Sequence, residues 1–510
     1  MSATTSRLPR SWTTARLEEI GEVITGNTPP TAHPEYYGGE IPFVRPPALK
    51  DGPITGTALR ISDDGARHAR IVPADAVFVS CIGILGKTGI ALAPSAFNQQ
   101  INAIVFTTQI NSRYGFYACQ TLTLQLEAVA SATTVSIVNK AKFAKLTIPV
   151  APSAEQHRIV AEIEKQLTRL NAAVAALEGA QTKLKRYRAS VLKAACEGRL
   201  VPTEAELARS EGRDYEPADT LLERILKDRR AKWEADQLQK MRGAGSEPKD
   251  DRWKAKYKEP VPPDFEGLTA SPEGWTWATL DQMSPVFVDC AHRTPKYSPT
   301  GFPALRPRDV VNGQLNLDGA ARVSQAEFDR QTERRIPQPG DIIYSRELSY
   351  GWGVKLPLGL EVCMSQGMAL IRPHPELDSD FFLILLNGPV GRRQAEGAAT
   401  GSAHPHINLG DIKSYTFPLP PTEEQRRITP EVDSRTSVIH HLEVSTQKCL
   451  ARAERLRQSI LKRAFEGKLV PQDPDDEPAR VLLERIQSER EQEDADARPK
   501  RKPRARSRAK

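Results

Sequence analysis

The chain has 510 residues, of which 39% are hydrophobic, and its 71 basic and 64 acidic residues give a net charge of +7. This length predicts more than one domain, and the lack of a run of about 18 apolar residues argues against a membrane-spanning helix. Residues 1–10 hold no apolar core and the six cysteines form no Cys-x-x-Cys pair. We therefore expect a cytoplasmic protein without a secretory signal or a zinc site.

A mixed α/β domain is predicted for residues 8–152. It opens with a Pro-x-Ser-Trp sequence that ends at Trp12. Short β-type runs occur at 41–44, 76–80 and 101–106, and residues 113–130 have helical character. Proline and glycine pairs divide the segment into short pieces, which is typical of a domain with many loops.

A long helix is predicted for residues 153–202. Ser153 stands where an N-cap belongs, and Gln156 three residues later fits a capping box. Gly198 is placed to be the C′ residue, with Pro202 as a stop. About 44 residues at 1.5 Å each make a rod roughly 65 Å long. Spacings of four and three indicate a coiled-coil seam made of Ile163, Leu167, Leu170, Val174, Leu177, Leu184 and Val191.

Residues 203–270 are predicted to be a charged helical insert and linker. An amphipathic helix is expected around residues 221–225, and a basic and aromatic run, Arg-Trp-Lys-Ala-Lys-Tyr-Lys, occupies residues 252–258. The composition leaves two interpretations of this run open, a solvated linker or a segment that docks on a partner protein or DNA.

Residues 271–421 repeat the first domain loosely. Pro-x-Gly-Trp ending at Trp275 matches the opening at Trp12, and Arg306 matches Arg45. The sequence also aligns Gln366 with Gln100. The loops between these matches differ widely, so the sequence predicts a shared framework that carries different surfaces.

Residues 422–471 repeat the long helix without a gap, at a constant offset of 269 residues. The expected seam is rougher here and consists of Val432, Ile439, Leu442, Leu456 and Ile460. A one-sided seam needs a partner, so we expect the two long helices to form an antiparallel coiled coil. The chain would then hold two domains related by a pseudo-twofold axis, an arrangement that two-fold DNA readers use on paired half-sites.

Residues 472–510 are predicted to be a short helix, around residues 482–486, followed by a charged, disordered tail from Glu491. Eight of the 71 basic residues lie in 498–510, which hold no acidic residue, so 63 basic residues face 64 acidic ones in the rest of the chain. The body is nearly neutral, and a basic surface on it depends on how charges are distributed.

From residue 8 to about 490 the chain resembles the specificity subunits of type I restriction-modification enzymes. The resemblance rests on the Trp12 and Trp275 openings, the two Pro-x-x-Glu-Gln helix starts at 152–156 and 421–425, and the two Glu-Gly-Arg/Lys-Leu-Val-Pro ends. It implies an α/β architecture of two target-recognition domains, 8–152 and 271–421, that each read one half of a bipartite, asymmetric DNA site.

The same resemblance implies that the chemistry belongs to partner chains. Two methyltransferase subunits and two motor-nuclease subunits are expected to join this chain, bringing adenine methylation with S-adenosylmethionine, and ATP and Mg²⁺, so that no cofactor is expected here. The sequence agrees, since it has no Asn-Pro-Pro-Tyr-like motif and no glycine-rich S-adenosylmethionine loop. The Gly-Lys-Thr at 86–88 fails as a P-loop because position 81 is cysteine, and we expect no metal at the histidine pair 404/406.

Base readout needs Arg or Lys against guanine and Asn or Gln against adenine on loops that enter the major groove. In the first domain the candidates are Arg45, Lys87, Asn98, Gln99, Gln100, Thr133 and Thr134, with Ser136 beside them. In the second they are Arg306, Arg346, Lys355, Gln366, His404 and His406. Because Arg45 and Arg306 match, a shared phosphate contact suits them better than base readout. Gln100 and Gln366 also match, which leaves a framework role open for them as an alternative to base readout.

Three alternatives remain open from sequence alone: a specificity subunit of a methylation-only system, a coiled-coil scaffold that does not bind DNA, and an autonomous enzyme. Salt-dependent DNA affinity separates the scaffold from the favoured interpretation, and activity of the isolated chain would identify an enzyme.

Overall fold

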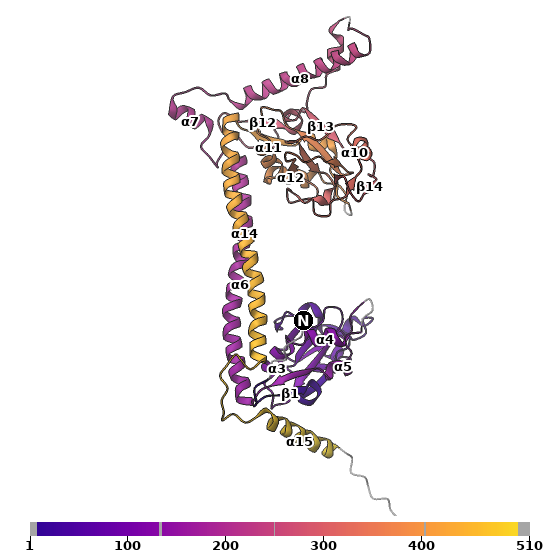
Figure 1. The fold of residues 1–510 in the computed structure, drawn as a ribbon, viewed down its shortest axis with the longest axis vertical. Coiled ribbons are helices and arrows are strands. Elements are labelled where there is room, and N and C mark those ends of the chain that lie inside the picture. Colours follow the sequence, from indigo (N-terminus) through magenta and orange to yellow (C-terminus); the bar gives the residue numbers. More distant parts are fainter. Residues whose placement is uncertain (1–7, 132–134, 249, 402–403, 498–510) are drawn as a thin grey trace, which may run out of the picture. The chain divides into compact units, whose positions relative to one another are not determined.

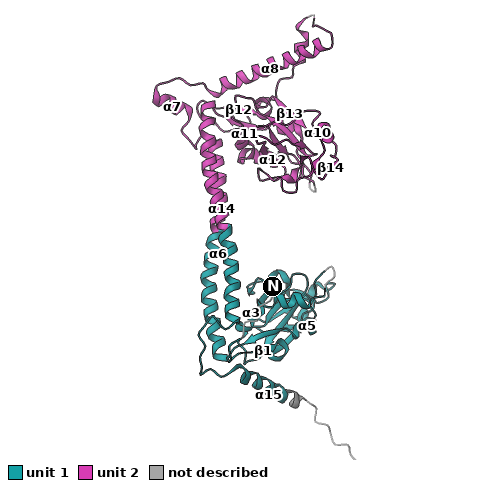
Figure 2. Ribbon diagram, in the orientation of Figure 1, with its two compact units in different colours: residues 1–178, 447–510 teal, residues 179–446 magenta. Residues whose placement is uncertain are grey.

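The structure is a computed structural model, and it describes residues 8–131, 135–248, 250–401 and 404–497. The chain forms two compact units, residues 1–178 with 447–510 and residues 179–446 (Figure 2). Each unit contains one α/β domain and one half of each of the two long helices, α6 (Ser153–Cys196) and α14 (Thr422–Phe465) (Figure 1). No helix among the described residues is long and apolar enough to span a membrane.

The α/β domain of the first unit is built on three small sheets. Their strand orders are β2-β10-β7-β8-β4, β5-β3-β9-β6 and β1-β11. The strands are β1 (Thr13–Arg16), β2 (Gly21–Thr25), β3 (Tyr37–Val44), β4 (Gly52–Pro53), β5 (Arg60–Ile61), β6 (Ile71–Val72), β7 (Val77–Ser80), β8 (Thr88–Ile90), β9 (Ser95–Phe97), β10 (Ile101–Phe106) and β11 (Thr147–Val150). The helices are α1 (Leu17–Ile20), η1 (Pro34–Tyr36), η2 (Pro46–Ala48), α2 (Asp63–Ala66), α3 (Ser112–Cys119), α4 (Thr123–Val129), α5 (Lys140–Ala144) and, after α14, α15 (Ala479–Ala497).

The second unit repeats this framework and adds a helical insert. Its sheets are β13-β22-β19-β20, β14-β18-β15-β21, β12-β23 and β16-β17. The strands are β12 (Thr276–Thr279), β13 (Val286–Asp289), β14 (Tyr297–Ser298), β15 (Phe302–Leu305), β16 (Val310–Val311), β17 (Gln314–Leu315), β18 (Arg322–Val323), β19 (Ile342–Ser345), β20 (Trp352–Lys355), β21 (Cys363–Met364), β22 (Met368–Arg372) and β23 (Thr416–Leu419). The helices are α7 (Glu204–Glu211), α8 (Ala218–Gly243), η3 (Asp251–Lys256), α9 (Leu280–Met283), η4 (Pro307–Asp309), α10 (Gln325–Gln331), α11 (Ser379–Asn387), α12 (Pro389–Ala398) and α13 (Leu409–Lys413).

The long helices pair in an antiparallel manner in both units. In the first unit the start of α6 shares a core with the end of α14, and the ring of Tyr114 lies 5.2 Å from that of Phe465. In the second unit the end of α6 shares a core with the start of α14, through residues such as Val191 and Val432. The predicted coiled coil is confirmed, because each unit buries one apolar stripe from both helices.

The seam of α14 differs from the sequence prediction at two positions. Leu442 and Leu456 are about half exposed, at 49% and 50%, so their assignment to the seam is wrong. The buried residues of the seam instead follow one another at intervals of seven. One of them is polar and one is small, so a search for large apolar residues does not find them. The members of the seam are Val432, Ile439, Thr446, the partly buried Ala453, and Ile460. In α6, Ile163, Leu167, Leu170 and Val191 are buried, and Val174, Leu177 and Leu184 are partly buried.

The ends of the long helices follow the prediction only in part. Gly198 and Gly467 adopt positive φ of 62° and 68°, as C′ residues do. The capping boxes are absent, because the Gln156 side chain forms its hydrogen bonds with residues that precede the helix. Its amide nitrogen donates to the carbonyl of Ala151 and its oxygen accepts from the backbone N–H of Asn111. Gln425 makes the corresponding two bonds in the second unit, so this glutamine fastens each domain to its helix.

The C-terminal helix α15 is longer than the sequence predicts. It continues to Ala497, past Glu491 where the tail was expected to begin. The Gln487 side chain donates to the Glu491 carboxylate at 3.0 Å, an i,i+4 contact that supports the helix. The basic segment 498–510 lies outside the described residues.

Candidate nucleic-acid interface

Four segments of the first unit meet at one place. They are the β7–β8 turn (81–87), the β9–β10 junction (98–100), the residues after β3 (45–48) and the described residues 131 and 135–138 of the loop after α4. The N–H of Cys81 donates to the carbonyl of Gln100 at 2.8 Å, and the carbonyl of Cys81 accepts from Val138 at 2.9 Å. Two further backbone bonds join the segments: the N–H of Gly83 donates to the carbonyl of Ser136, and the N–H of Asn98 donates to the carbonyl of Val44. We call these four segments the loop face of the unit.

The second unit has the same loop face, bond for bond. The N–H of Arg346 donates to the carbonyl of Gly367 at 2.7 Å, and the carbonyl of Arg346 accepts from Ile407 at 2.9 Å. In the remaining two bonds the N–H of Leu348 donates to the carbonyl of Pro405, and the N–H of Ser365 donates to the carbonyl of Leu305. The segments are 346–351, 365–367, 306–309 and the described residues 400–401 and 404–407. Identical backbone hydrogen bonding with different side chains is the arrangement that a shared scaffold with two different surfaces requires.

The sheet registers correct one sequence alignment. Ile101 pairs with Ser80 in the first unit, and Met368 pairs with Ser345 in the second. Counting back from these pairs places Gln366 opposite Gln99, so the alignment of Gln366 with Gln100 is one residue off. The match of Arg45 with Arg306 holds, since each follows the last paired residue of β3 or β15.

In the first unit the exposed candidates on the loop face are Arg45, Lys87 and Gln99. The Lys87 ammonium lies 3.0 Å from the Asp51 carboxylate, so it is held in position while half exposed. Asn98 is buried and donates to the Gln100 side chain at 2.8 Å, which gives this pair a role in shaping the junction. Thr133 and Thr134 lie outside the described residues.

In the second unit Gln366, His404 and His406 are on the loop face, and all three are exposed. The Arg306 guanidinium is fixed by two bonds of 3.0 and 3.1 Å to Asp309 and keeps 17% of its side-chain surface exposed. A hollow of about 250 Å³ is lined by Arg306 and Gln366 among others, and an adjoining hollow of about 290 Å³ is lined by both histidines. Both hollows share Glu347 and Leu348.

Two candidates of the second unit do not present their side chains on this surface. Arg346 is 9% exposed, and its guanidinium donates to the Asp289 carboxylate at 2.8 Å and to the carbonyl of Ile407 at 3.3 Å. Lys355 forms an ion pair with Asp380 and stands at the end of the β19–β20 hairpin that is opposite the loop face. We therefore assign Arg346 to shaping the loop and leave Lys355 out of the interface.

The tips of the two hairpins carry residues that the sequence did not single out. Ile84 is 75% exposed, and Leu348 is 59% exposed with a φ of +56°. Positive φ is uncommon for a branched residue, and Gly83 occupies the equivalent position in the first unit. An apolar side chain at such a tip is suited to the methyl group of thymine. The glycines Gly83 and Gly86 in the β7–β8 turn mark a tight hairpin, and this was the sequence signal that could have identified the exposed tip.

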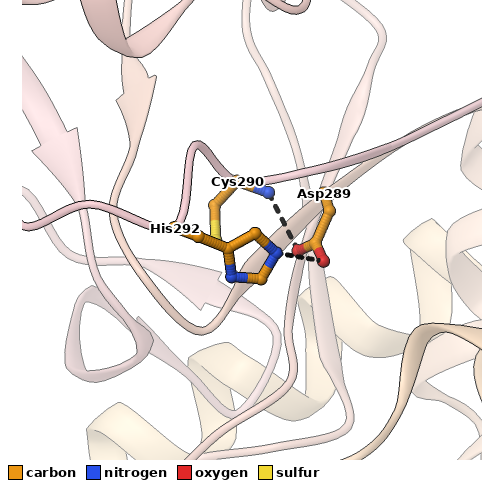
Figure 3. Close-up of side chains that lie close together, drawn as sticks. All are labelled: Asp289, Cys290 and His292. Atoms are coloured by element: carbon orange, nitrogen blue, oxygen red, sulfur yellow. Dashed lines mark hydrogen bonds and ion pairs between the residues drawn. The ribbon is translucent and has the colours of Figure 1, made fainter.

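Asp289, Cys290 and His292 cluster beside the loop face of the second unit (Figure 3). The His292 imidazole lies 2.8 Å from the Asp289 carboxylate, which also accepts from Arg346. A cation here would have to displace a guanidinium from its only acidic partner among the described residues. We interpret the cluster as a charge-balanced support for the Arg346 loop.

The model for the family described as "Type I restriction modification DNA specificity domain" matches residues 9–178 and 272–434, which is more than half of the chain. The chain belongs to the type I restriction-modification DNA specificity family. The two matched segments each contain one α/β domain and the start of one long helix, so the family pattern occurs twice. Members of this family are non-catalytic DNA-recognition subunits.

Similar proteins support this membership. The type I restriction enzyme EcoBI specificity subunit of Escherichia coli is 24% identical over 484 residues, covering 93% of this chain and 86% of the relative. The HindI specificity subunit of Haemophilus influenzae is 31% identical over 172 residues, 32% of this chain and 37% of that one. A solved chain from a study of complex assembly and conformational transition of the type I R-M system aligns with a TM-score of 0.61 at 18% identity, covering 91% of this chain and 99% of that chain. This last likeness shows that the fold is shared.

Proposed function

We propose that this chain reads a bipartite, asymmetric DNA site, one half with the loop face of each unit, within a type I restriction-modification complex. The observation that carries the proposal is the repeated loop face: four equivalent backbone hydrogen bonds in each unit present side chains that differ. Asymmetric half-sites follow, because Lys87 stands on one loop face while His404 and His406 stand on the other; Gln99 and Gln366 occupy equivalent positions on the two faces.

The proposed contacts are divided by chemistry. Arg45 and Arg306 are exposed or partly exposed at equivalent positions and contact phosphate, which positions the duplex without reading sequence. The exposed glutamines Gln99 and Gln366 read adenine edges, and Lys87 reads guanine. The histidines 404 and 406 extend the surface of the second unit. Residues 8–152 and 271–421 are proposed as the target-recognition domains, and the continuous long helices set the spacer.

The chemistry is proposed to reside in partner chains. Two methyltransferase subunits that use S-adenosylmethionine for adenine methylation, and two motor-nuclease subunits that use ATP and Mg²⁺, assemble on this chain. Its own residues then recognise DNA and hold these subunits, and none of them takes part in bond making or breaking.

The test is adenine methylation across the genome of cells that express the methyltransferase partner, with and without this chain. The expected result is one motif of two short half-sites around a fixed spacer that disappears when the chain is deleted. An unchanged methylation pattern, with the partner expressed and active, would contradict the proposal.

A further inference from the structure

The basic and aromatic run at 252–258 folds back onto α8 and is not a solvated linker. Trp253 is 8% exposed, and its indole stacks on that of Trp233 with ring centres 6.0 Å apart. The Tyr257 ring lies 5.3 Å from the same indole, and the Arg230 guanidinium lies 5.6 Å from the Tyr257 ring. The run and the helix therefore form one ordered arm of the second unit, which we call the α8 arm.

The α8 arm is fastened to the recognition domain at its base. Leu221 and Ile225 are fully buried in the core of the second unit. The Asp281 carboxylate accepts from the Arg229 guanidinium at 3.1 Å and from the backbone N–H of Val261 at 3.2 Å, so it holds both the outgoing helix and the returning linker. The arm thus has a defined position on its own domain.

A groove of about 660 Å³ lies where the arm meets the edge strand β13. Its lining includes Lys232, Lys256, Lys258 and Arg335, against one acidic residue, Asp236. These four cations are exposed, and none forms an ion pair with another described residue. Arg229, the fifth cation of the lining, is paired with Asp281. Neighbouring cations of the arm differ, since Arg230 and Lys254 are both paired with Glu234. The groove therefore concentrates uncompensated positive charge on a nearly neutral body.

Strand β13 links the groove to the loop face. Val286 and Val288 line the groove, and Asp289 at the end of the same strand bonds Arg346 of the loop face. At about 3.3 Å per residue this strand spans about 10 Å, which corresponds to about three base pairs along a duplex. The chain then continues to Thr294, which lines the loop-face hollow beside Arg306.

We propose that the groove binds the phosphate backbone of the DNA that flanks the half-site read by the second unit. This inference rests on the proposed function and adds a contact outside the recognised sequence. The Trp233 and Tyr257 rings of the groove already pack on each other and hold the arm in shape, and the Lys413 ammonium lies over the Phe287 ring, so the exposed lysines are the free binding groups of the groove. A contact of this kind adds affinity that depends on salt and adds no sequence preference.

The test compares the full chain, assembled with its methyltransferase partner, with the triple variant K232A/K256A/K258A. We expect the slope of log affinity against log salt concentration to become shallower by about 0.9 for each phosphate that the variant no longer neutralises, or up to about 2.7. The ratio of affinities for matched and mismatched sites should not change. The charge-preserving variant K232R/K256R/K258R is the control and should keep the original slope. Shortening the duplex to the edge of the second half-site should weaken the original chain and leave the alanine variant unaffected.

The outcomes separate the flanking contact from the proposed function. An unchanged slope in the alanine variant, with site preference retained, overturns the flanking contact and leaves the proposed function standing. Failure of the alanine variant to assemble with the methyltransferase identifies the groove as a protein-docking surface and also overturns the contact. If the original chain shows no site preference, the proposed function fails, and the slope on non-specific duplex still decides whether the groove binds phosphate.

Discussion

The indole nitrogen of Trp12 donates a hydrogen bond of 2.9 Å to the carboxylate of Glu155. The tryptophan opens the first domain and the glutamate stands in the first turn of α6, so one bond joins domain to helix. The second unit repeats it, with Trp275 donating to Glu424 at 3.1 Å. All four residues are buried, and the repeated Trp and Glu-Gln signatures of the sequence are therefore the two sides of one joint.

Removing the indole donor should destabilise the joint. In Trp12→Phe the buried Glu155 carboxylate loses a hydrogen bond to a charged group, and we expect a decrease of about 1.5–3 kcal/mol in the free energy of unfolding. Trp277→Phe is the control, because this half-buried indole donates to no other described residue, and it should change much less. Urea denaturation monitored by circular dichroism measures both. Equal effects of the two substitutions would contradict a role for the bond.

Glu155 should also give the joint a pH dependence. Burial raises the pKa of its carboxyl above the ordinary 4.5, and the hydrogen bonds from Trp12 and Gln472 oppose this only in part. Between the ordinary and the raised pKa the folded state binds more protons than the unfolded state, so the free energy of unfolding falls as pH rises through this window.

Glu155→Gln keeps an acceptor for Trp12 and removes the titration. The stability of the original chain relative to this variant should therefore decline as pH rises from about 4.5 and become constant above the raised pKa. Denaturation curves of both proteins over this pH range measure the difference. A relative stability that increases with pH would mean that the folded carboxyl has a lowered pKa, contrary to its burial.

The seam of α14 yields a matched pair of substitutions. Ile439 is 1% exposed and Leu442 is 49% exposed. We expect Ile439→Ala to cost about 2–5 kcal/mol in the free energy of unfolding because it leaves a cavity. Leu442→Ala should change this free energy by about 0.5 kcal/mol or less. Chemical denaturation distinguishes the two, and a larger loss for Leu442→Ala would restore the seam predicted from sequence.

The loop faces should be independent of each other. Gln366→Ala should lower discrimination at one base pair of the second half-site by about 1–3 kcal/mol, since it removes a bidentate hydrogen-bonding partner of adenine. Gln99→Ala should do the same in the first half-site only. Competition binding against duplexes with single substitutions measures both. A loss that is uniform over all positions would assign these glutamines to phosphate contact.

The repeat made much of this architecture predictable. Both long helices, their antiparallel pairing and the glycine C′ residues follow from periodicity and end signals, and the Trp12 and Trp275 matches define the joints. The roles of Gln156 and Gln425 were not predictable, because a capping box and a bond to a distant N–H require the same residue type at the same position. Thr446 was missed in the seam because a polar residue gives no hydrophobic signal.

The loop face was harder to predict than the framework. A register slip of one residue moves Gln366 from the Gln100 position to the Gln99 position, and only the sheet pairing resolves it. Arg346 is of a residue type that reads bases, yet its side chain is buried and bonded to Asp289. Asp289 lies 57 residues away in sequence, and no local pattern reports such a partner.

Exchange of residues 8–152 for the corresponding domain of a relative with a different target most directly tests the assignment of one half-site to each unit. The measurement is the adenine methylation motif in cells that express the exchanged chain and the same methyltransferase partner. We predict that one half-site changes to that of the donor while the other half-site and the spacer stay the same. A motif that changes in both halves, or in neither while methylation persists, would contradict the assignment.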